Sequence, residues 1–146
     1  LRGLPADVGA VHVGSISSWT EPGSTAIADL VDRLSGEALI SVDPNIRPML
    51  ADGPVGATLG NDRAAVIRRL DALIARADLV KVSAEDLAWL EPGTPDLDDA
   101  VRRWADRGPA LVVLTDGGAP LRIARPGGPV LRREIPRVDV VDGERR

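Results

Sequence analysis

The feature of this sequence that most constrains its fold is the regular alternation of strand-like and helix-like segments. Short runs of β-branched and other apolar residues predict strands at 9–15, 38–44, 78–83 and 110–115. Between them lie longer stretches in which apolar residues recur three or four positions apart, the spacing of one helix face. Strands that alternate with helices are typical of a mainly parallel sheet with right-handed connections. We therefore predict an α/β fold with helices on both faces of the sheet.

Capping signals mark where the helices are expected to begin. The expected N-caps are Ser24, Asn61, Ser83 and Thr94. The helix after Asn61 has the clearest apolar stripe, which extends to Ala77. These signals predict helices that each bury one face against the sheet.

The last third of the chain has a different pattern. Residues 110–115 are almost continuously apolar, which predicts a strand buried on both faces. Segments 121–125 and 129–136 instead alternate between apolar and polar residues, and a Pro-Gly-Gly-Pro sequence joins them. We therefore expect an antiparallel hairpin at the edge of the sheet.

Composition narrows the classes of function. The 146 residues suffice for one domain, 1–146, with a hydrophobic core. Cysteine is absent and there is one histidine, which excludes a disulfide framework and argues against a Cys or His metal site. The 2% aromatic content and the net charge of −4 argue against a nucleic-acid partner. No signal peptide or long apolar run occurs, so we expect a cytoplasmic protein without a membrane segment.

Polar segments follow each of the four predicted strands directly. They are 14–15, 43–47, 83–86 and 115–118. In open α/β sheets ligands bind beyond the carboxyl ends of the strands. We therefore expect these four segments to meet at one edge of the sheet and to contain the binding site. His12 lies inside a predicted strand, and we expect it to be a core or edge histidine.

The segment "DPNIRP", residues 43–48, supplies a carboxylate, an amide and a guanidinium from Asp43, Asn45 and Arg47. Two prolines stiffen it. A guanidinium binds phosphate or carboxylate in a bidentate manner, which suits an anionic or polyhydroxylated ligand. The alternative is a proline-rich turn in which Asp43 bonds its own backbone and Arg47 points to solvent.

The segment "KVSAEDL" contains Ser83 and, three residues later, Asp86. One interpretation is a capping box at the start of a helix, although the usual partner is Glu or Gln. The other is an acidic cluster that orders a metal ion and its waters near phosphate groups. The two interpretations are compatible.

The segment "LTDGGAP" places Thr115 at the end of a strand, followed by Gly117 and Gly118. Small residues allow backbone N–H groups to approach a nucleotide closely. The segment has neither the Gly-Lys-Ser/Thr of a Walker motif nor a GxGxxG pattern. The alternative is an ordinary glycine turn.

The order of these motifs is more specific than any single one. A strand ending in "GS", then "DPNIRP", "ADLVKVSAEDLAWL", "ALVVLTDGG", a hairpin and "VDVVD" follow one another. This series resembles the PfkB/ribokinase family of carbohydrate kinases, and it is closest to the fructokinase branch. The resemblance covers roughly residues 6–142. It implies a ribokinase-like three-layer (Rossmann-like) mainly parallel sheet with an antiparallel edge hairpin, incomplete here, and ATP-dependent phosphorylation of a sugar hydroxyl with Mg²⁺.

The resemblance also implies roles for individual residues. It assigns the sugar and phosphate region to Asp43, Asn45 and Arg47, and the nucleotide-binding turn to Thr115, Gly117 and Gly118. Ser83 and Asp86 occupy the place of the family's Asn-x-x-Glu segment, which organises metal and phosphates, with Ser in place of Asn and Asp in place of Glu. A further glycine that the family has in the nucleotide turn is Pro120 in this chain.

The sequence after Asp142 departs from the family pattern. In the family, a strand like "VDVVD" leads into a Gly-Ala-Gly-Asp segment, whose amides form an anion hole and whose Asp is the base for the sugar hydroxyl. Here residues 143–146 are "GERR". The family's N-terminal part with its lid has no counterpart either. We therefore expect a truncated kinase domain with no catalytic residue of its own and with weak or no activity.

Two other hypotheses remain open from the sequence. One is a non-catalytic module that binds a nucleotide for regulation or assembly. The other is a Rossmann-like oxidoreductase domain, against which the lack of GxGxxG with a downstream acidic residue counts. The expected partners are a small-molecule sugar and ATP, and a homodimer of a full-length parent is compatible with the family.

Overall fold

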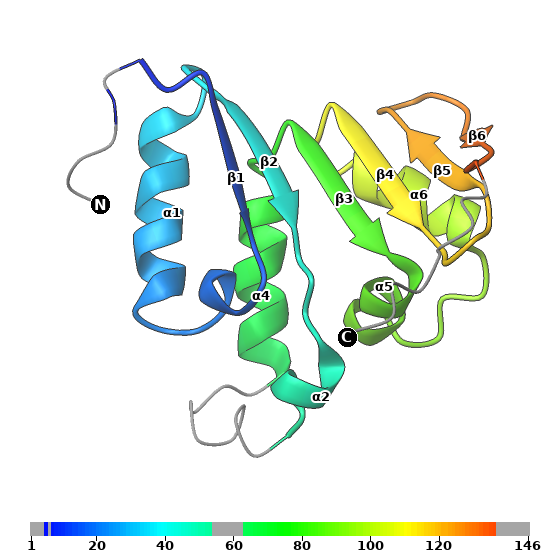
Figure 1. Ribbon diagram of the computed structural model, residues 1–146, viewed down its shortest axis with the longest axis horizontal. Helices are drawn as coiled ribbons and strands as arrows, with labels where there is room; N and C mark the ends of the chain where they lie inside the picture. Colours follow the sequence, from blue (N-terminus) through cyan, green and yellow to red (C-terminus); the bar gives the residue numbers. More distant parts are fainter. Residues whose placement is uncertain (1–4, 6, 54–62, 137–146) are drawn as a thin grey trace, which may run out of the picture.

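One mixed sheet organises the part of the chain that the structure, a computed structural model, describes, namely residues 5, 7–53 and 63–136 (Figure 1). Its six strands lie in the order β1-β2-β3-β4-β5-β6. They are β1 (Ala10–Gly14), β2 (Leu39–Asp43), β3 (Leu79–Ser83), β4 (Leu111–Thr115), β5 (Leu121–Ala124) and β6 (Leu131–Arg133). Strands β1 to β4 pair in parallel, whereas β4–β5 and β5–β6 are antiparallel. This confirms the predicted α/β sheet and its edge hairpin.

Short helices connect the parallel strands. They are η1 (Ile16–Ser18, a 3-10 turn), α1 (Gly23–Leu34), α2 (Pro48–Ala51), α4 (Arg63–Ile74), α5 (Ala84–Leu90) and α6 (Leu97–Ala105). The longest of them, α1 and α4, have 12 residues each. Among the described residues no helix has the length and apolar character that crossing a bilayer requires. The predicted "VDVVD" strand and the Asn61 cap lie outside the described residues.

Two of the predicted helix caps are wrong. Helix α1 already includes Ser24, whose hydroxyl donates to Glu21 Oε1 at 2.7 Å instead of capping the helix. Helix α6 is capped by Asp96 rather than Thr94, because the Asp96 carboxylate accepts from the backbone N–H groups of Asp98 and Asp99. A carboxylate two residues closer to the helix satisfies these N–H groups better than the threonine hydroxyl. The Ser83 cap of α5 is confirmed.

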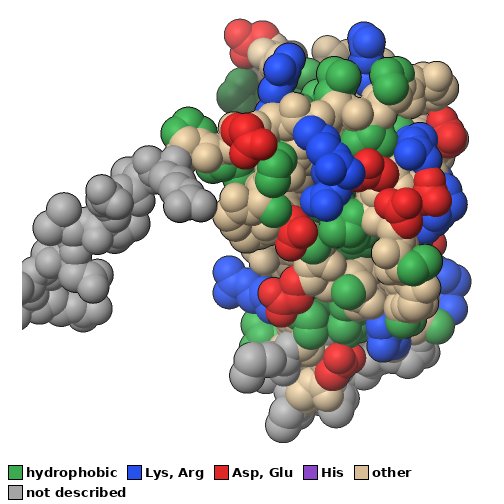
Figure 2. Space-filling view, turned by 90° about the vertical axis from the view of Figure 1, so that its right-hand side faces the viewer, with side chains coloured by type: hydrophobic (Ala, Val, Ile, Leu, Met, Phe, Trp, Pro, Cys, Tyr) green, Lys and Arg blue, Asp and Glu red, His purple; other side chains and the backbone are tan. Residues whose placement is uncertain are grey.

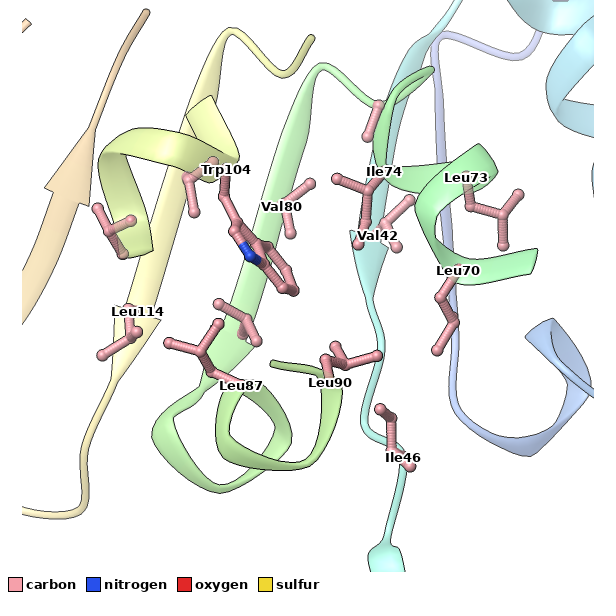
Figure 3. Close-up of a cluster of buried hydrophobic side chains, with 14 of the residues drawn as sticks. Val42, Ile46, Leu70, Leu73, Ile74, Val80, Leu87, Leu90, Trp104 and Leu114 are labelled. Carbon is pink, nitrogen blue, oxygen red and sulfur yellow. The ribbon is translucent and has the colours of Figure 1, made fainter. Parts of the chain in front are cut away.

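The two faces of the sheet are covered unequally. The buried side chains alternate along the strands and comprise Ile40, Val42, Val80, Val82, Val112 and Leu114. Figure 3 shows Val42, Val80 and Leu114 among them, packed under helices α4, α5 and α6 together with the buried ring of Trp104. Right-handed connections between strands that follow one another in order place their helices on the same face. Helix α1 packs beside α4 on this side, where Arg76 pairs with Asp32 at 2.7 Å.

The opposite face of the sheet is only half-buried among the described residues. Ser41, Lys81 and Val113 point away from the helices and keep part of their surface in contact with solvent. The described helices therefore do not flank both faces, and β4 is not buried on both sides as its apolar run predicted. Alternate residues of the run, Val112 and Leu114, face the core under the helices. The residues between them lie on the opposite, half-buried face of the sheet.

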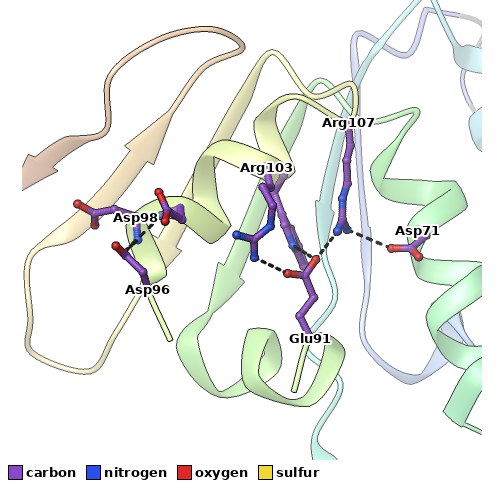
Figure 4. A network of polar contacts seen from close by, with 8 residues as sticks. Asp71, Glu91, Asp96, Asp98, Arg103 and Arg107 are labelled. Atoms are coloured by element: carbon purple, nitrogen blue, oxygen red, sulfur yellow. Dashed lines mark hydrogen bonds and ion pairs between the residues drawn. The ribbon is translucent and has the colours of Figure 1, made fainter. Parts of the chain in front are cut away.

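The partly buried carboxylate of Glu91 links the end of α5 to helices α6 and α4 (Figure 4). It accepts hydrogen bonds from Arg103 at 3.0 Å and from Trp104 Nε1 at 2.9 Å, and it pairs with Arg107. Arg107 also reaches Asp71 on α4 at 3.3 Å. Burial raises the pKa of Glu91, but the hydrogen bonds from Arg103 and Trp104 and the charge of Arg107 outweigh it, so the pKa lies below its usual value.

A second carboxylate, Asp98, fastens the edge hairpin to α6. It accepts from Arg122 Nε at 2.9 Å and from Arg132 Nη2 at 2.8 Å, and these arginines lie on β5 and β6. Arg122 also faces Asp116, in the turn after β4, at 3.6 Å. On the side of the molecule that carries the hairpin, acidic and basic side chains are interspersed with hydrophobic ones (Figure 2).

Candidate functional site

The carboxyl ends of the four parallel strands meet at one edge of the sheet, as predicted (Figure 1). In the register of the sheet Gly14 lies beside Asp43, and Ser83 lies beside Thr115. All four polar segments that follow the strands are therefore neighbours in space although they are far apart in the sequence. This edge is the candidate site.

The first hollow at this edge lies between β2, β3 and the start of α5. Its volume is about 290 Å³, and it is lined by Asn45, Arg47, Pro48, Lys81, Ser83, Glu85 and Asp86. The guanidinium of Arg47 and the ammonium of Lys81 are thus on the same hollow. These two cations are suited to a multiply charged anion, although the side chains of Glu85 and Asp86 line the same hollow. We call this hollow the cationic hollow.

A second hollow adjoins it on the side of β1. It has a volume of about 440 Å³, and its polar lining consists of His12, Ser15, Ser17, Asp43 and Asn45. Asn45 lines both hollows. Hydroxyl, amide and carboxylate groups of this kind are the usual hydrogen-bonding partners of polyhydroxylated ligands. We call this one the hydroxyl-rich hollow.

The carboxylate of Asp43 connects the two hollows, because Asp43 lines the hydroxyl-rich hollow and its ion-pair partner Lys81 lines the cationic hollow. Its Oδ2 pairs with Lys81 Nζ at 3.1 Å. Its Oδ1 is buried and accepts no hydrogen bond from the described residues. A buried carboxylate oxygen without a donor is costly, so a hydroxyl donor from a ligand or from water suits this atom.

Three non-glycine residues at this edge have left-handed backbone conformations. The φ angles are 59° at Ser15, 37° at Asn45 and 53° at Arg47. Each such conformation costs about 1–3 kcal/mol and is found preferentially at functional sites. The backbone N–H of Ser15 donates to the carbonyls of Asp43 and Pro44 at 3.3 and 3.1 Å, which ties the ends of β1 and β2 together. Strain concentrated at one edge supports a functional role for it.

Glycine is required where β1 and β2 end. A Cβ atom placed on Gly14 lies only 2.0 Å from the carbonyl oxygen of Asp43. No other residue fits there without movement of the β2 end. The "GS" after the first strand thus has a steric reason in addition to its place in the motif series.

Ser83 and Asp86 form the capping arrangement that the sequence suggested. Ser83 Oγ accepts from the backbone N–H of Asp86 at 3.0 Å and donates to Asp86 Oδ2 at 2.7 Å. Asp86 Oδ1 accepts from the backbone N–H of Ile46 at 2.9 Å. Among the described residues no three acidic, histidine or cysteine side chains converge as metal ligands. The residues present therefore do not fit a Mg²⁺ site built from protein ligands alone.

The predicted nucleotide turn lies at the end of β4 and lines neither hollow. Gly117 has a left-handed φ of 53°, and the N–H of Ala119 closes the turn on the carbonyl of Asp116 at 2.9 Å. Cβ atoms on Gly117 and Gly118 meet no atom within 4 Å, so the turn has open space around it. Thr115 reaches the site edge through its pairing with Ser83.

The sequence analysis missed Lys81 as a site residue. The signal was present, because residues two apart on a strand share a face and Ser83, two residues on, was already a candidate. His12 was expected to be a core or edge histidine. It lies on β1, which is the end strand of the sheet as far as the structure describes it, with Nδ1 3.0 Å from Ser41 Oγ.

Sequence comparison finds the same relatives that the motif series suggested, although no family model matches the chain. The chain is 34% identical over 117 residues to the fructokinase of Rhizobium leguminosarum bv. trifolii, an alignment that covers 80% of this chain and 33% of that protein. It is 32% identical over 111 residues to the fructokinase of Salmonella thompson, covering 75% and 46%. The chain therefore spans between a third and a half of these relatives' length.

Comparison with solved structures identifies the same fold. The aminoimidazole riboside kinase from Salmonella enterica, complexed with aminoimidazole riboside and an ATP analog, has a TM-score of 0.74 at 22% identity and covers 95% of this chain and 44% of its own. The fructokinase with bound ATP from Xylella fastidiosa has a TM-score of 0.70 at 26% identity, with 90% and 38% covered.

The parallel sheet with its edge hairpin, the polar segments at one sheet edge and these similarities agree with one another. They confirm the expected family on the basis of both sequence and fold. The chain belongs to the PfkB/ribokinase family of carbohydrate kinases, close to the fructokinases.

Proposed function

We propose that this chain is part of an ATP-dependent kinase that phosphorylates a sugar hydroxyl, with fructose as the sugar. The observation that carries the proposal is the pair of adjoining hollows at the carboxyl ends of the parallel strands, one cationic and one rich in hydroxyl and carboxylate groups. The similarity to fructokinases supports fructose in preference to other sugars.

The cationic hollow is proposed to bind the phosphates of ATP. Phosphoryl transfer depends mainly on positioning and on stabilising charge that spreads over the transferred group. Arg47 supplies a planar fork for two phosphate oxygens, and Lys81 supplies a point charge. Asp43 pairs with Lys81 and holds its ammonium group at the border between the hollows.

The hydroxyl-rich hollow is proposed to bind the sugar. Asp43 Oδ1 is available to accept a hydrogen bond from a sugar hydroxyl, and Asn45 supplies an amide that serves both as donor and as acceptor. The turn with Thr115, Gly117 and Gly118 is proposed to contact the nucleotide beyond its phosphates, where its small residues leave room.

Mg²⁺ enters this proposal through the nucleotide. A Mg²⁺ ion bound together with the nucleotide would neutralise part of the charge on its phosphates. Since the described residues provide no cluster of three ligands, we assign no direct metal ligand to Ser83 or Asp86 and derive no step through the metal.

The 146 residues contain no Gly-Ala-Gly-Asp segment, to which the resemblance gives the anion hole and the base. We therefore propose that these residues by themselves bind ATP measurably but transfer its phosphate to a sugar weakly or not at all. Loss of an anion hole alone lowers rates by roughly 10²–10³-fold.

Calorimetric titration of the purified chain with ATP and Mg²⁺ tests the proposal. We expect measurable binding, and we expect Arg47→Ala to weaken it by about 10-fold or more, since a charge-assisted phosphate contact is lost. The affinity for AMP, which lacks the two outer phosphates, should change little on the same substitution. The matched control is Arg125→Ala, which removes the same charge from an exposed arginine at the opposite edge of the sheet, after β5.

Failure of the unsubstituted 146-residue chain to bind ATP would overturn the nucleotide part of the proposal. Equal weakening by Arg47→Ala and Arg125→Ala would show that the effect is one of net charge rather than of the cationic hollow. Incubation with ATP and either fructose or ribose, followed by product analysis, tests the rest. Rapid phosphorylation of fructose by the chain would contradict the expectation of weak activity.

A further inference from the structure

The carboxylate of Asp86 is buried, with 5% of the residue exposed, and both of its oxygens accept hydrogen bonds from the protein. Oδ1 accepts from the backbone N–H of Ile46, and Oδ2 accepts from the hydroxyl of Ser83. Ser83 in turn accepts from the backbone N–H of Asp86. The side chain thus connects the start of α5 to the segment that follows β2.

Ile46, to which Asp86 is bonded, lies between the two site residues with left-handed backbones. Its side chain is fully buried, at 0% exposure, while Asn45 and Arg47 on either side line the cationic hollow. A short segment with φ angles of 37° and 53° around one residue needs an external constraint to remain in that conformation. The buried Ile46 side chain and its N–H bond to Asp86 provide that constraint.

We propose that Asp86 is a positioning residue that acts through the Ile46 amide to hold Asn45 and Arg47 in the cationic hollow. This proposal rests on the proposed function for the identity of the ligand, but not for the contact itself. In this arrangement Asp86 serves as a hydrogen-bond acceptor, and its negative charge is not what the site uses. In this interpretation Ser83 and Asp86, which replace the family's Asn and Glu, work together, because Ser83 holds one oxygen of the Asp86 carboxylate.

The geometry gives the reason why this pair belongs together. An aspartate is one methylene shorter than a glutamate, so its carboxylate stays close to the helix start, where Ser83 can hold one oxygen and leave the other for Ile46. An asparagine at position 86 keeps an oxygen acceptor for the Ile46 N–H, and its amide N–H can donate to Ser83 Oγ. An alanine removes both contacts. A glutamate has to place an extra methylene in a buried space.

The experiment compares Asp86→Asn, Asp86→Ala and Asp86→Glu with the parent chain. One readout is hydrogen exchange of the Ile46 amide, with the Val113 amide in β4 as the internal reference for global stability. The second is ATP affinity, measured with Mg²⁺ and with EDTA. The matched control is Asp78→Ala, because Asp78 accepts from the backbone N–H of Ile40 at 2.8 Å in the same way but at the opposite edge of the sheet.

We expect Asp86→Asn to keep Ile46 protection and ATP affinity within about 3-fold of the parent, and to leave the ratio of the affinities with Mg²⁺ and EDTA unchanged. Asp86→Ala and Asp86→Glu should speed Ile46 exchange by about 10-fold or more and weaken ATP binding by a similar factor, with Val113 unaffected. Asp78→Ala should leave both Ile46 exchange and ATP affinity unchanged.

The opposite pattern overturns the proposal. If Asp86→Asn retains Ile46 protection but loses the Mg²⁺-dependent part of ATP affinity, the charge of Asp86 acts on the metal and the positioning role is wrong. If Asp86→Ala leaves Ile46 exchange unchanged, the contact does not hold the segment. A parent chain that does not bind ATP refutes the proposed function, whereas the exchange data still decide whether Asp86 holds the segment.

Discussion

At the scale of single residues, Glu91 shows how one carboxylate can join three structural elements. Arg103 and Trp104 of α6 donate to it, and Arg107 lies between it and Asp71 of α4 (Figure 4). Charge-assisted hydrogen bonds of this kind are stronger than neutral ones, and the carboxylate is mostly shielded from solvent. The residue therefore stabilises the packing of the helices on the sheet.

We expect Glu91→Gln to lower the free energy of unfolding by about 1–3 kcal/mol at neutral pH, because the charge is lost while its arginine partners remain. The pKa of Glu91 is lower in the folded chain than its ordinary value of 4.5, so its stabilisation is complete above that value. It is lost as the pH falls through the lowered folded pKa. Urea unfolding at several pH values should therefore show the variant and the parent converging in acid.

The control for this substitution is Glu37→Gln, at an exposed position just after α1. It should leave the urea midpoint unchanged over the same pH range. A destabilisation by Glu91→Gln that stays constant down to the most acidic pH would contradict the assignment, because it would not depend on the ionised carboxylate.

Among the glycines that the structure describes, Gly14 is the one at which an added Cβ has the closest neighbour, at 2.0 Å. We expect Gly14→Ala to lower the free energy of unfolding by about 1–3 kcal/mol, because the new methyl group collides with the Asp43 carbonyl. Since Asp43 leads directly into the candidate site, ATP affinity should fall as well. Gly9→Ala, where a Cβ meets no atom within 4 Å, is the comparison, and equal urea midpoints for the two variants would refute the steric argument.

At the scale of elements, the sequence predicted the existence and order of the strands and helices better than their ends. Period and composition are properties of a whole segment, so they survive small local errors. A cap depends on which of several neighbouring oxygens reaches the free N–H groups. Asp96 caps α6 instead of Thr94 because it is closer in sequence to the free N–H groups of the first turn. The sequence contains both candidates and does not rank their geometry.

Whether one or both faces of a strand are buried could not be predicted from the residues of that strand alone. The apolar run that forms β4 is the pattern of a strand covered on both sides, yet Val112 and Leu114 are buried while Val113 between them is half-buried. Which face is covered follows from the order of the strands and the handedness of the connections. These are properties of the sheet, not of one strand.

The candidate site was predictable for a related reason. Once the strands were predicted to be parallel, their carboxyl ends had to share one edge, and Asn45, Arg47, Ser83 and Asp86 are together as a result. The hydrogen bond from Ile46 to Asp86 could not be predicted. It joins residues 40 apart in the sequence, and it depends on the positive φ angles of Asn45 and Arg47, for which the sequence has no clear signal.

At the scale of the whole molecule, the sheet has a firm centre and a weaker hairpin edge. Strands β2, β3 and β4 carry fully buried side chains under the helices. The three residues of β6 are all exposed, and within residues 5, 7–53 and 63–136 this strand pairs with β5 alone. Local opening is easiest where few apolar contacts and many solvent-exposed backbone bonds occur.

We therefore expect the amides that join β5 and β6 to exchange their hydrogens at least about 100-fold faster than those that join β3 and β4. Hydrogen exchange followed by NMR measures both sets in one experiment. Uniform protection across all six strands would show that the sheet opens as one unit and that the hairpin is no weaker than the centre.

The attachment of the hairpin to α6 through Asp98, Arg122 and Arg132 has a consequence for how the molecule responds to its medium. Dissolved ions screen charges that solvent can reach, whereas apolar packing under the helices is insensitive to such screening. Arg132 is largely exposed and Arg122 is not, so ionic strength loosens the outer strand before the inner one. The two halves of this sheet therefore respond differently to dissolved salt, because ion pairs attach the outer strand of the hairpin whereas apolar packing holds the central strands.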